Sequence, residues 1–263
     1  MTDAIKSMAM GLPKSSVRVL RVETSTSALL RILMRRKAAR LSGRPLVIHE
    51  QNAAAGMTNR LLARIASKVL QAFPNTFVSA TTVGNPVRAG FVELAAPAQR
   101  LSAHQGAPRL LVLGGSQGSG NLNQWAEQNL AALAHEGIQV YCVTGLGKGS
   151  EGVRELTDKS GRVVRSWFEA FSDRVGVLMS AADLVLSRAG AGTLAELVRC
   201  ETPAVLIPYP HAADNHQWAN ATYFEQQGGG VVVADHALAG LRQEVLDVVF
   251  NDWLLNKFRT NLH

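Results

Sequence analysis

Short apolar runs alternate with segments of helical periodicity along most of this chain, and that alternation restricts the possible folds more than any other feature. The runs that we predict to be strands are Pro45–His49, Val69–Phe73, Arg109–Gly114, Gln139–Thr144, Val163–Trp167, Leu184–Ser187, Ala204–Pro208 and Gly230–Val233. The predicted helices are Thr58–Lys68, Leu122–His135, Val175–Ala182, a helix from Thr193, Asn215–Gln226 and a long final stretch from Leu238. This pattern predicts an α/β protein with parallel sheets flanked by helices, whose ligands lie at the carboxyl ends of strands.

A stretch rich in Pro and Ala, Ala95–Pro108, predicts a linker between two domains. A chain of 263 residues is long enough for two modest domains, each with its own core. We therefore expect an N-terminal domain over residues 1–100 and a C-terminal domain over residues 105–263.

The composition is that of a folded soluble protein, with 47% apolar and 18% charged residues. Cys142 and Cys200 lie far apart without the spacing of a metal site, which favours a reducing cytosol. No signal peptide is visible, and no apolar run reaches the roughly 18 residues that a membrane-spanning helix needs.

The positive charge is concentrated at the start of the chain. Residues 1–45 contain ten Lys or Arg and two acidic residues, a net charge of +8, so the rest of this +7 chain carries −1. Aromatic residues do not alternate with these basic ones, so we expect no nucleic acid as a partner. Residues 28–41 predict a basic amphipathic helix, which would lie on an anionic membrane surface or pack on its own domain with its charges solvated.

A glycine-rich loop follows one predicted strand and leads into a helix, in the segment 110–120. Glycines let the backbone approach an anion closely, the helix start offers amide donors, and Ser116 adds a hydroxyl, so the loop is typical of a phosphate site. A dinucleotide site would require an acidic residue at the end of the next strand, Gln139–Thr144, and none is there. A glycine turn without a ligand stays open as an alternative.

A second glycine-rich turn, residues 187–192, opens the helix that carries Glu196. Amides at a helix start suit a phosphate, and a nearby carboxylate suits vicinal hydroxyls, which together indicate a sugar nucleotide. The alternative is a capping box, in which Thr193 closes the helix start and Glu196 bonds back to it. Arg188 would balance a phosphate or pair with a carboxylate.

Three further polar clusters lie at the ends of predicted strands or at a helix start. Asp214 and Asn215 precede a helix with His216 and Gln217, and a Gln side chain offers both a donor and an acceptor to sugar hydroxyls; the Asp-Asn pair can also serve only as a cap. The other two clusters are His49–Asn52 and Val83–Arg88, for which a ligand site and an ordinary turn both stay open. No Asp-x-Asp pair is present to anchor a metal, and we expect neither a metal nor a cofactor.

In this order, the motifs resemble the MurG-type family of UDP-N-acetylglucosamine transferases, which act in peptidoglycan synthesis. The matching residues are His49–Asn52 with Gly56, Thr58 and Asn59, Val83–Arg88, Gly114–Gly118, Ser187–Glu196, and His216, Gln217, Asn220 and Ala221. The resemblance implies a GT-B fold of two Rossmann-like domains. It also implies an inverting transfer of N-acetylglucosamine from UDP-N-acetylglucosamine to a lipid-linked muramyl-peptide acceptor, on the inner face of the cytoplasmic membrane.

Carried over residue by residue, the resemblance also implies a donor site. Glu196 would hold the ribose, the loop of Ser116 the diphosphate, and Gln217 and Asn52 the N-acetylglucosamine. Arg88 would lie close to the nucleotide, and the uracil contact falls near Phe171–Asp173. The turn that would contact nucleotide and sugar through its backbone comprises Ala191, Gly192, Thr193, Leu194 and Ala195.

The acceptor side departs from the family pattern. Two glycine-rich loops that the family has before the strand Pro45–His49 are not found, and the first of them carries the His often assigned as general base. The resemblance therefore implies a shortened, incomplete N-terminal domain, with His49 as a weak candidate for the base. The alternative function is a relative that binds the UDP-sugar without transferring it.

Overall fold

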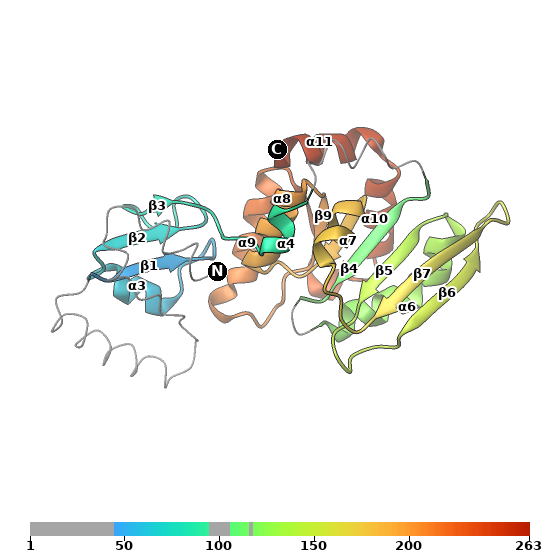
Figure 1. Cartoon of the computed structure of the whole chain (residues 1–263), viewed down its shortest axis with the longest axis horizontal. Helices are drawn as coiled ribbons and strands as arrows, with labels where there is room; N and C mark the ends of the chain where they lie inside the picture. The colour runs from blue at the N-terminus through green and yellow to red at the C-terminus, as the bar shows by residue number, and fades with distance from the viewer. Residues whose placement is uncertain (1–44, 95–105, 116–117) are drawn as a thin grey trace. The chain divides into compact units, whose positions relative to one another are not determined.

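The structure, a computed structural model, describes residues 45–94, 106–115 and 118–263 (Figure 1). The predicted basic helix at 28–41 and Ser116 lie outside the described residues. The chain divides into two compact units: the first takes residues up to Pro86 together with His211–Ala219, and the second takes Val87–Pro210 together with Asn220–His263. Within the described residues, no helix is both long enough and apolar enough to cross a membrane.

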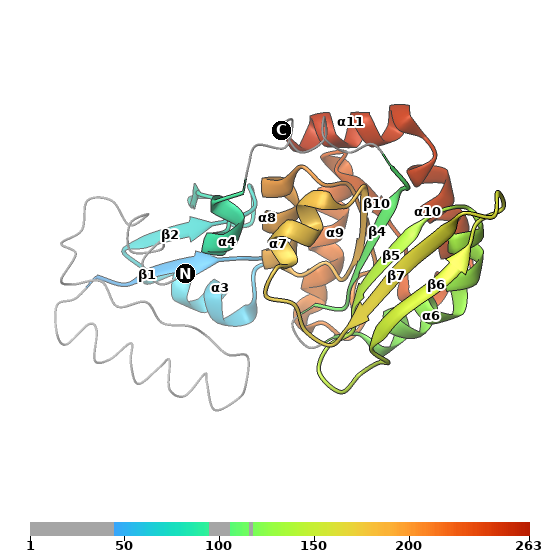
Figure 2. The same cartoon turned by 45° about the vertical axis from the view of Figure 1, so that its right-hand side comes forward.

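The second unit is built on a seven-stranded sheet with the order β10-β9-β8-β4-β5-β7-β6 (Figures 1 and 2). Its strands are β4 (Arg109–Leu113), β5 (Gln139–Val143), β6 (Gly152–Thr157), β7 (Val163–Glu169), β8 (Leu184–Ser187), β9 (Ala204–Leu206) and β10 (Gly230–Val232). All neighbours pair in parallel except β6, which runs antiparallel to β7 at the edge. The expectation of a parallel α/β sheet is confirmed for six of the seven strands.

Helices cover both faces of this sheet. They are α4 (Ala89–Val92), α6 (Gly120–His135), α7 (Val175–Ala181), α8 (Ala191–Cys200), α9 (His216–Gln226), α10 (Leu241–Val249) and α11 (Asp252–Leu262). Alternate residues of the central strands, such as Leu110 and Val112 of β4, share a fully apolar core with α6, α10 and α11. On β4, α7 packs as well, and α8 packs against α7. This burial of continuous apolar runs fixes the strand order and so the positions of the loops.

The first unit contains a three-stranded parallel sheet among its described residues. Its strands are β1 (Val47–Glu50), β2 (Lys68–Gln71) and β3 (Thr81–Thr82), in the order β1-β2-β3, with helix α3 (Met57–Ala63) packed on β1. The buried apolar side chains of this part include Ile48, Leu62, Leu70 and Phe73. The polar residues that follow β1 therefore come directly after a strand of a small packed core.

The boundary between the two units lies between Pro86 and Val87, which is earlier in the chain than the predicted linker. Residues 87–94 count with the second unit, where α4 packs on α7 and α8, and residues 95–105 lie outside the described residues. The domain boundaries of 1–100 and 105–263 stay a prediction.

Several secondary-structure expectations are wrong: the predicted helix Thr58–Lys68 ends at Ala63, helix α4 was not predicted, and two further differences have a clear physical reason. The strand β6 was not predicted, because as an edge strand it has exposed or half-exposed side chains throughout and no apolar run. The single long helix from Leu238 is instead two helices, α10 and α11. They separate because the Asn251 side chain accepts a hydrogen bond from Leu254 N at 3.0 Å and so caps the start of α11.

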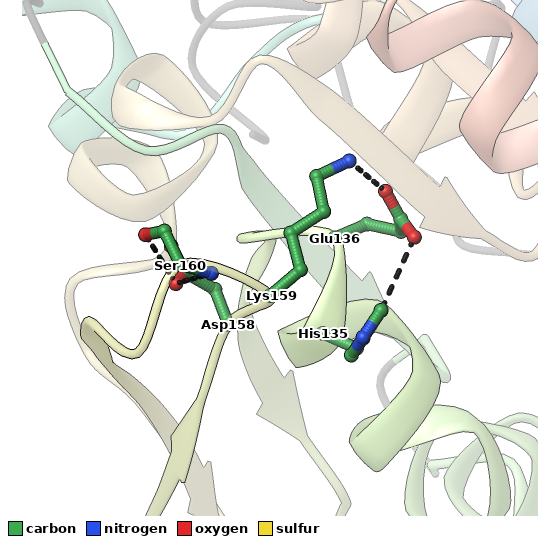
Figure 3. A network of polar contacts seen from close by, with 5 residues as sticks. All are labelled: His135, Glu136, Asp158, Lys159 and Ser160. Atoms are coloured by element: carbon green, nitrogen blue, oxygen red, sulfur yellow. Dashed lines mark hydrogen bonds and ion pairs between the residues drawn. The ribbon is translucent and has the colours of Figure 1, made fainter.

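The turn between β6 and β7 is built around one buried carboxylate, that of Asp158 (Figure 3). Its Oδ1 accepts hydrogen bonds from Ser160 N at 2.8 Å, Ser160 Oγ at 2.7 Å and Arg162 N at 3.0 Å. Lys159 Nζ lies 2.8 Å from Glu136 Oε2, at the end of α6, and this ion pair joins the hairpin to the helix. The hairpin is therefore held by side chains of its turn as well as by its ladder.

We expect Asp158→Asn to lower the thermal midpoint of unfolding at neutral pH and to weaken the loss of stability in acid. The hydrogen bond from Ser160, with those from Arg162, lowers the pKa of Asp158 below its ordinary value of 3.8. Because the folded-state pKa is the lower one, the stabilisation is present above the unfolded value and is lost as pH falls through the folded value. Thermal melts at about pH 7 and about pH 3 test this, and Asp247→Asn, on an exposed carboxylate, is the control. Equal melting of Asp158→Asn and wild type at both pH values would show that the carboxylate does not hold the turn.

Candidate functional site

The order of strands in the second unit reverses between β4 and β8, and we call the carboxyl ends of these two strands the β4–β8 switch point. The chain proceeds from β4 to β5 on one side, and later returns to β8 on the other side of β4. In open α/β sheets, ligands bind at such a reversal, beyond the carboxyl ends of the strands. Both glycine-rich motifs predicted from the sequence begin here, since β4 leads into α6 and β8 leads into α8.

The loop from β4 to α6 is as tight as its glycines suggested. A Cβ atom on Gly114 would collide with the backbone nitrogen of Ser119 and would lie 2.6 Å from Gly118 C. Gly118 has a φ of +69°, and a Cβ there would collide with the carbonyl oxygen of Thr144. Gly114 and Gly118 thus bring the loop backbone close to the start of α6 without side chains of their own, an arrangement that suits an anion. Ser116 is not among the described residues.

The turn from β8 to α8 does not form the capping box that the sequence suggested. The helix begins at Ala191 with Gly190 as its N-cap residue, and the cap makes no side-chain hydrogen bond. Thr193 and Glu196 are therefore inside the helix, and Glu196 is one turn too late to bond back to the helix start. The capping-box alternative is wrong, because the extended backbone at Gly190 starts the helix before Thr193.

The carboxylate of Glu196 instead forms an ion pair with Arg88. Arg88 Nε lies 2.7 Å from Glu196 Oε1, although 108 positions separate the two residues in the sequence. The Glu196 side chain is 11% exposed and that of Arg88 is 63% exposed, so the pair faces solvent on the arginine side. Arg88 precedes α4, which packs on α8, and its guanidinium also lies over the Phe91 ring. Two residues predicted for the donor site are thus brought together in one unit.

The five residues predicted to line the nucleotide and sugar through their backbone are Ala191, Gly192, Thr193, Leu194 and Ala195. They form the first turn and a half of α8, which starts at the β4–β8 switch point. Phe171, near the predicted uracil contact, follows β7 and is 70% exposed. The roles of these residues stay predictions.

Arg188 has a positioning role that the sequence left open. Its guanidinium is buried and bonds to Asp235 Oδ1 at 2.6 Å, to Ser119 Oγ at 3.0 Å and to the Ile207 carbonyl oxygen at 3.2 Å. These partners follow or precede different strands and helices at the same edge of the sheet, so one cation ties the edge together. Of the two alternatives, a phosphate or a carboxylate partner, the structure provides the carboxylate. No local sequence signal identifies Asp235 as that partner, because it lies 47 positions away.

A second positioning residue, Asn123, was missed by the sequence analysis. It is buried in α6, and its Nδ2 donates to the carbonyl oxygens of Thr144 at 2.8 Å and Lys148 at 2.9 Å. These bonds hold the segment after β5 next to Gly118. The only available signal was an Asn within an otherwise apolar helix face.

Helix α9 carries Gln217 in its first turn, within the part of the chain that counts with the first unit. Asp214 and Asn215, just before it, have φ angles of 50° and 52°, a left-handed conformation that short polar residues tolerate. Further along α9, Asn220 belongs to the second unit and donates from Nδ2 to the Ala189 carbonyl oxygen at 3.1 Å. This bond attaches α9 to the turn between β8 and α8.

In the first unit, the predicted residue His49 lies in β1, and Asn52 lies two residues after the end of that strand. His49 Nε2 donates to the Gly84 carbonyl oxygen at 3.0 Å, while Nδ1 is buried and has no hydrogen-bond partner within the described part of the chain. Burial lowers the pKa of His49 from 6.5, against smaller opposing effects of Gly84 and Glu50. The imidazole is thus neutral at pH 7, with Nδ1 as an acceptor.

We expect the first unit to lose stability as pH falls below the ordinary His value. The unfolded chain binds a proton at His49 more readily than the folded chain, because the folded pKa is the lower one. The stabilisation is therefore complete above 6.5 and declines as pH falls toward the folded value. Urea unfolding of wild type and His49→Gln at about pH 7.5 and about pH 5.5 measures it. His49→Gln should reduce the dependence of the free energy of unfolding on pH. An unchanged dependence would show that groups other than His49 cause it.

Comparison with known proteins identifies the family. Residues 109–258, which include both loops of the β4–β8 switch point, match the glycosyltransferase family 28 C-terminal domain. A UDP-N-acetylglucosamine--N-acetylmuramyl-(pentapeptide) pyrophosphoryl-undecaprenol N-acetylglucosamine transferase of Opitutus terrae is 50% identical over 85% of this chain and 61% of its own length. The transferase of the same name from Xylella fastidiosa is 42% identical over 84% of this chain and 60% of its own. The chain thus spans about three fifths of the length of these relatives.

Solved structures agree with this assignment. MurG of Acinetobacter baumannii matches with a TM-score of 0.69 and 26% identity, over 95% of this chain and 77% of that one. CalG4, a calicheamicin glycosyltransferase, matches with a TM-score of 0.60 and 16% identity, over 89% of this chain and 66% of that one, and shows the fold alone. The predicted GT-B type of α/β fold is confirmed. The chain therefore belongs to glycosyltransferase family 28, and within that family it is of the MurG type.

Proposed function

We propose that this chain transfers N-acetylglucosamine from UDP-N-acetylglucosamine to a lipid-linked muramyl-peptide acceptor in peptidoglycan synthesis. The observation that carries the proposal is the β4–β8 switch point, where two helices begin without side-chain caps and the Glu196 carboxylate lies on the second of them. Helix-start amides bind a diphosphate, and a carboxylate binds vicinal hydroxyls. The named relatives at 42–50% identity support the same donor and acceptor.

In the proposed reaction, a base removes the proton of the acceptor hydroxyl. The resulting oxygen attacks the anomeric carbon of the sugar, the bond from that carbon to the diphosphate breaks, and UDP leaves with the electron pair. The amides at the start of α6, beside Gly118, would stabilise the charge that develops on the leaving diphosphate. His49 is the candidate base that the family resemblance offers, and burial lowers its pKa, which keeps the imidazole neutral at pH 7.

The proposal includes the location of the reaction. Because the acceptor is lipid-linked, the enzyme would work at the inner face of the cytoplasmic membrane as a peripheral protein. The net charge of +8 on residues 1–45 favours contact with an anionic lipid surface, and the proposal includes no nucleic acid. The roles of Asn52, Arg88, Ser116, Gln217 and the start of α8 belong to the same proposal.

A transfer assay tests this function. The full chain is incubated with UDP-N-acetylglucosamine labelled in the sugar and with a lipid-linked muramyl-peptide acceptor, and the lipid product is separated. Label in the lipid fraction is the expected result. Binding of UDP-N-acetylglucosamine without transfer would support the binding-only alternative, and absence of UDP binding would contradict both.

We expect Glu196→Ala to weaken UDP binding by about 1–3 kcal/mol, the usual cost of losing charged hydrogen bonds. The fold should tolerate the change, because the Arg88 partner is 63% exposed and its charge stays solvated. Isothermal titration with UDP measures the effect. Glu155→Ala is the matched control, since Glu155 forms an ion pair of the same 2.7 Å length with the exposed Arg165 on the hairpin. Equal UDP affinity of the two variants would remove Glu196 from the nucleotide site.

A further inference from the structure

Ser119 directly precedes α6 and has both the side chain and the backbone of a helix cap. Its φ of −135° and ψ of 109° are extended, and its carbonyl oxygen accepts a helical hydrogen bond from Asn123 N at 3.0 Å. A serine in this position usually turns its hydroxyl oxygen toward the first helical turn and accepts a hydrogen bond from a backbone amide there. Asn251 does so at the start of α11, where its side chain accepts from Leu254 N at 3.0 Å. By the same rule, Ser119 should cap α6.

The Ser119 side chain does not cap α6, however. It makes no hydrogen bond to the start of the helix. Its hydroxyl oxygen instead accepts a hydrogen bond from Arg188 Nη2 at 3.0 Å, and both residues are buried. The hydroxyl is thus held away from the helix amides by a residue 69 positions further along the chain.

The Arg188 guanidinium is itself fixed through its other terminal nitrogen. Nη1 lies 2.6 Å from Asp235 Oδ1 and donates to the carbonyl oxygens of Ile207 at 3.2 Å and Pro208 at 3.4 Å. Because the guanidinium is planar, these bonds also fix the direction of Nη2. Turning Nη2 away from Ser119 would therefore break several buried hydrogen bonds at once.

We infer that Arg188 is a positioning residue that keeps the start of α6 free of its own cap for the diphosphate of the UDP-sugar donor; this inference rests on the proposed function. The amides at a helix start bind either a capping side chain or an anion, so a cap must be displaced before the anion binds. By holding the Ser119 hydroxyl, Arg188 removes that competition before the ligand arrives. Ser119, Arg188, Asp235 and α6 all belong to the second unit.

The experiment measures UDP binding to the full chain by isothermal titration, using wild type, Arg188→Lys, Ser119→Ala and the double variant. Lysine keeps a cation beside Asp235 but lacks the planar fork, so it cannot also hold the Ser119 hydroxyl. The freed hydroxyl should then cap α6. We expect UDP affinity to fall about fivefold, the effect of one capping bond that the diphosphate must displace.

The double variant separates this role from a merely structural one. Ser119→Ala alone should bind UDP within about twofold of wild type, because it has no hydroxyl to cap the helix. Added to Arg188→Lys, the same substitution should restore UDP affinity to within about twofold of wild type. If Arg188 only stabilised the edge of the sheet, removing a second buried hydrogen-bonding group could not restore binding.

Two results would overturn the inference while the proposed function stands. They are wild-type UDP affinity in Arg188→Lys, and a loss in the double variant as large as that in Arg188→Lys. If Arg188→Lys does not fold, as judged by its thermal melt, Arg188→Met combined with Asp235→Asn replaces it. That pair of substitutions removes the cation together with the charge that it would leave unpaired, and the same outcomes apply. Failure of the wild-type chain to bind UDP would instead overturn the proposed function.

Discussion

Replacing Arg188 with Met is expected to lower the free energy of unfolding of the second unit by about 3–5 kcal/mol, the usual cost of breaking a buried ion pair. The side chains of Arg188 and Asp235 are 9% and 17% exposed, so the substitution leaves the Asp235 charge largely buried without its cation. It also removes the bond to Ser119 Oγ and those to the carbonyl oxygens of Ile207 and Pro208. Urea unfolding followed by circular dichroism measures the loss.

Two further variants show what causes this loss of stability. Adding Asp235→Asn to Arg188→Met should recover part of the stability, because it removes the unpaired charge. Arg165→Met is the surface control, since Arg165 is 62% exposed in its pair with Glu155 and should cost little. Equal destabilisation by Arg188→Met and Arg165→Met would mean that Arg188 does not tie the edge of the sheet together.

Substituting Gly114 by Ala is expected to reduce UDP affinity about a hundredfold, a loss near 2.7 kcal/mol. The new methyl group would collide with the Ser119 nitrogen and lie 2.6 Å from Gly118 C, and both of these are backbone atoms at the start of α6. The loop must open to admit it, which displaces the amides that would bind the diphosphate. Isothermal titration with UDP, on protein shown by its thermal melt to be folded, measures the effect.

Gly120→Ala is the matched control for this loop. Gly120 is the first residue of α6, and a Cβ atom there would have no neighbour within 4 Å. Alanine also favours a helix over glycine, so the control should melt no lower than wild type and bind UDP equally well. If both variants bound UDP alike, the tight loop would have no part in binding the nucleotide.

The strands at the centre of the second sheet were predictable because they are buried on both faces. β4 and β8 appear within one residue of their predicted ends, since a strand that is buried on both faces leaves a continuous apolar run in the sequence. β6 has no such run, because it lies at the edge of the sheet and its side chains are exposed or half-buried throughout. Helix ends were harder to predict, since the pattern Thr-x-x-Glu does not show whether the helix starts at that Thr or at the preceding glycine.

The candidate site was predictable in its parts but not in its connections. The motifs around Glu196 and Arg88 could be found in the sequence, whereas their ion pair depends on the packing of α4 against α8. The partners of Arg188 likewise became evident only in the fold. Arg188 reaches Asp235 across 47 positions and Ser119 across 69. The sequence identifies the ionisable residues, but the tertiary structure decides which partners they have.

A crystal structure of the chain with bound UDP would test the central claim most directly. We predict density for the diphosphate over the start of α6, beside Gly114 and Gly118, with the ribose hydroxyls within hydrogen-bonding distance of the Glu196 carboxylate. Density for UDP at any other place on the second unit, with none at the β4–β8 switch point, would contradict the account.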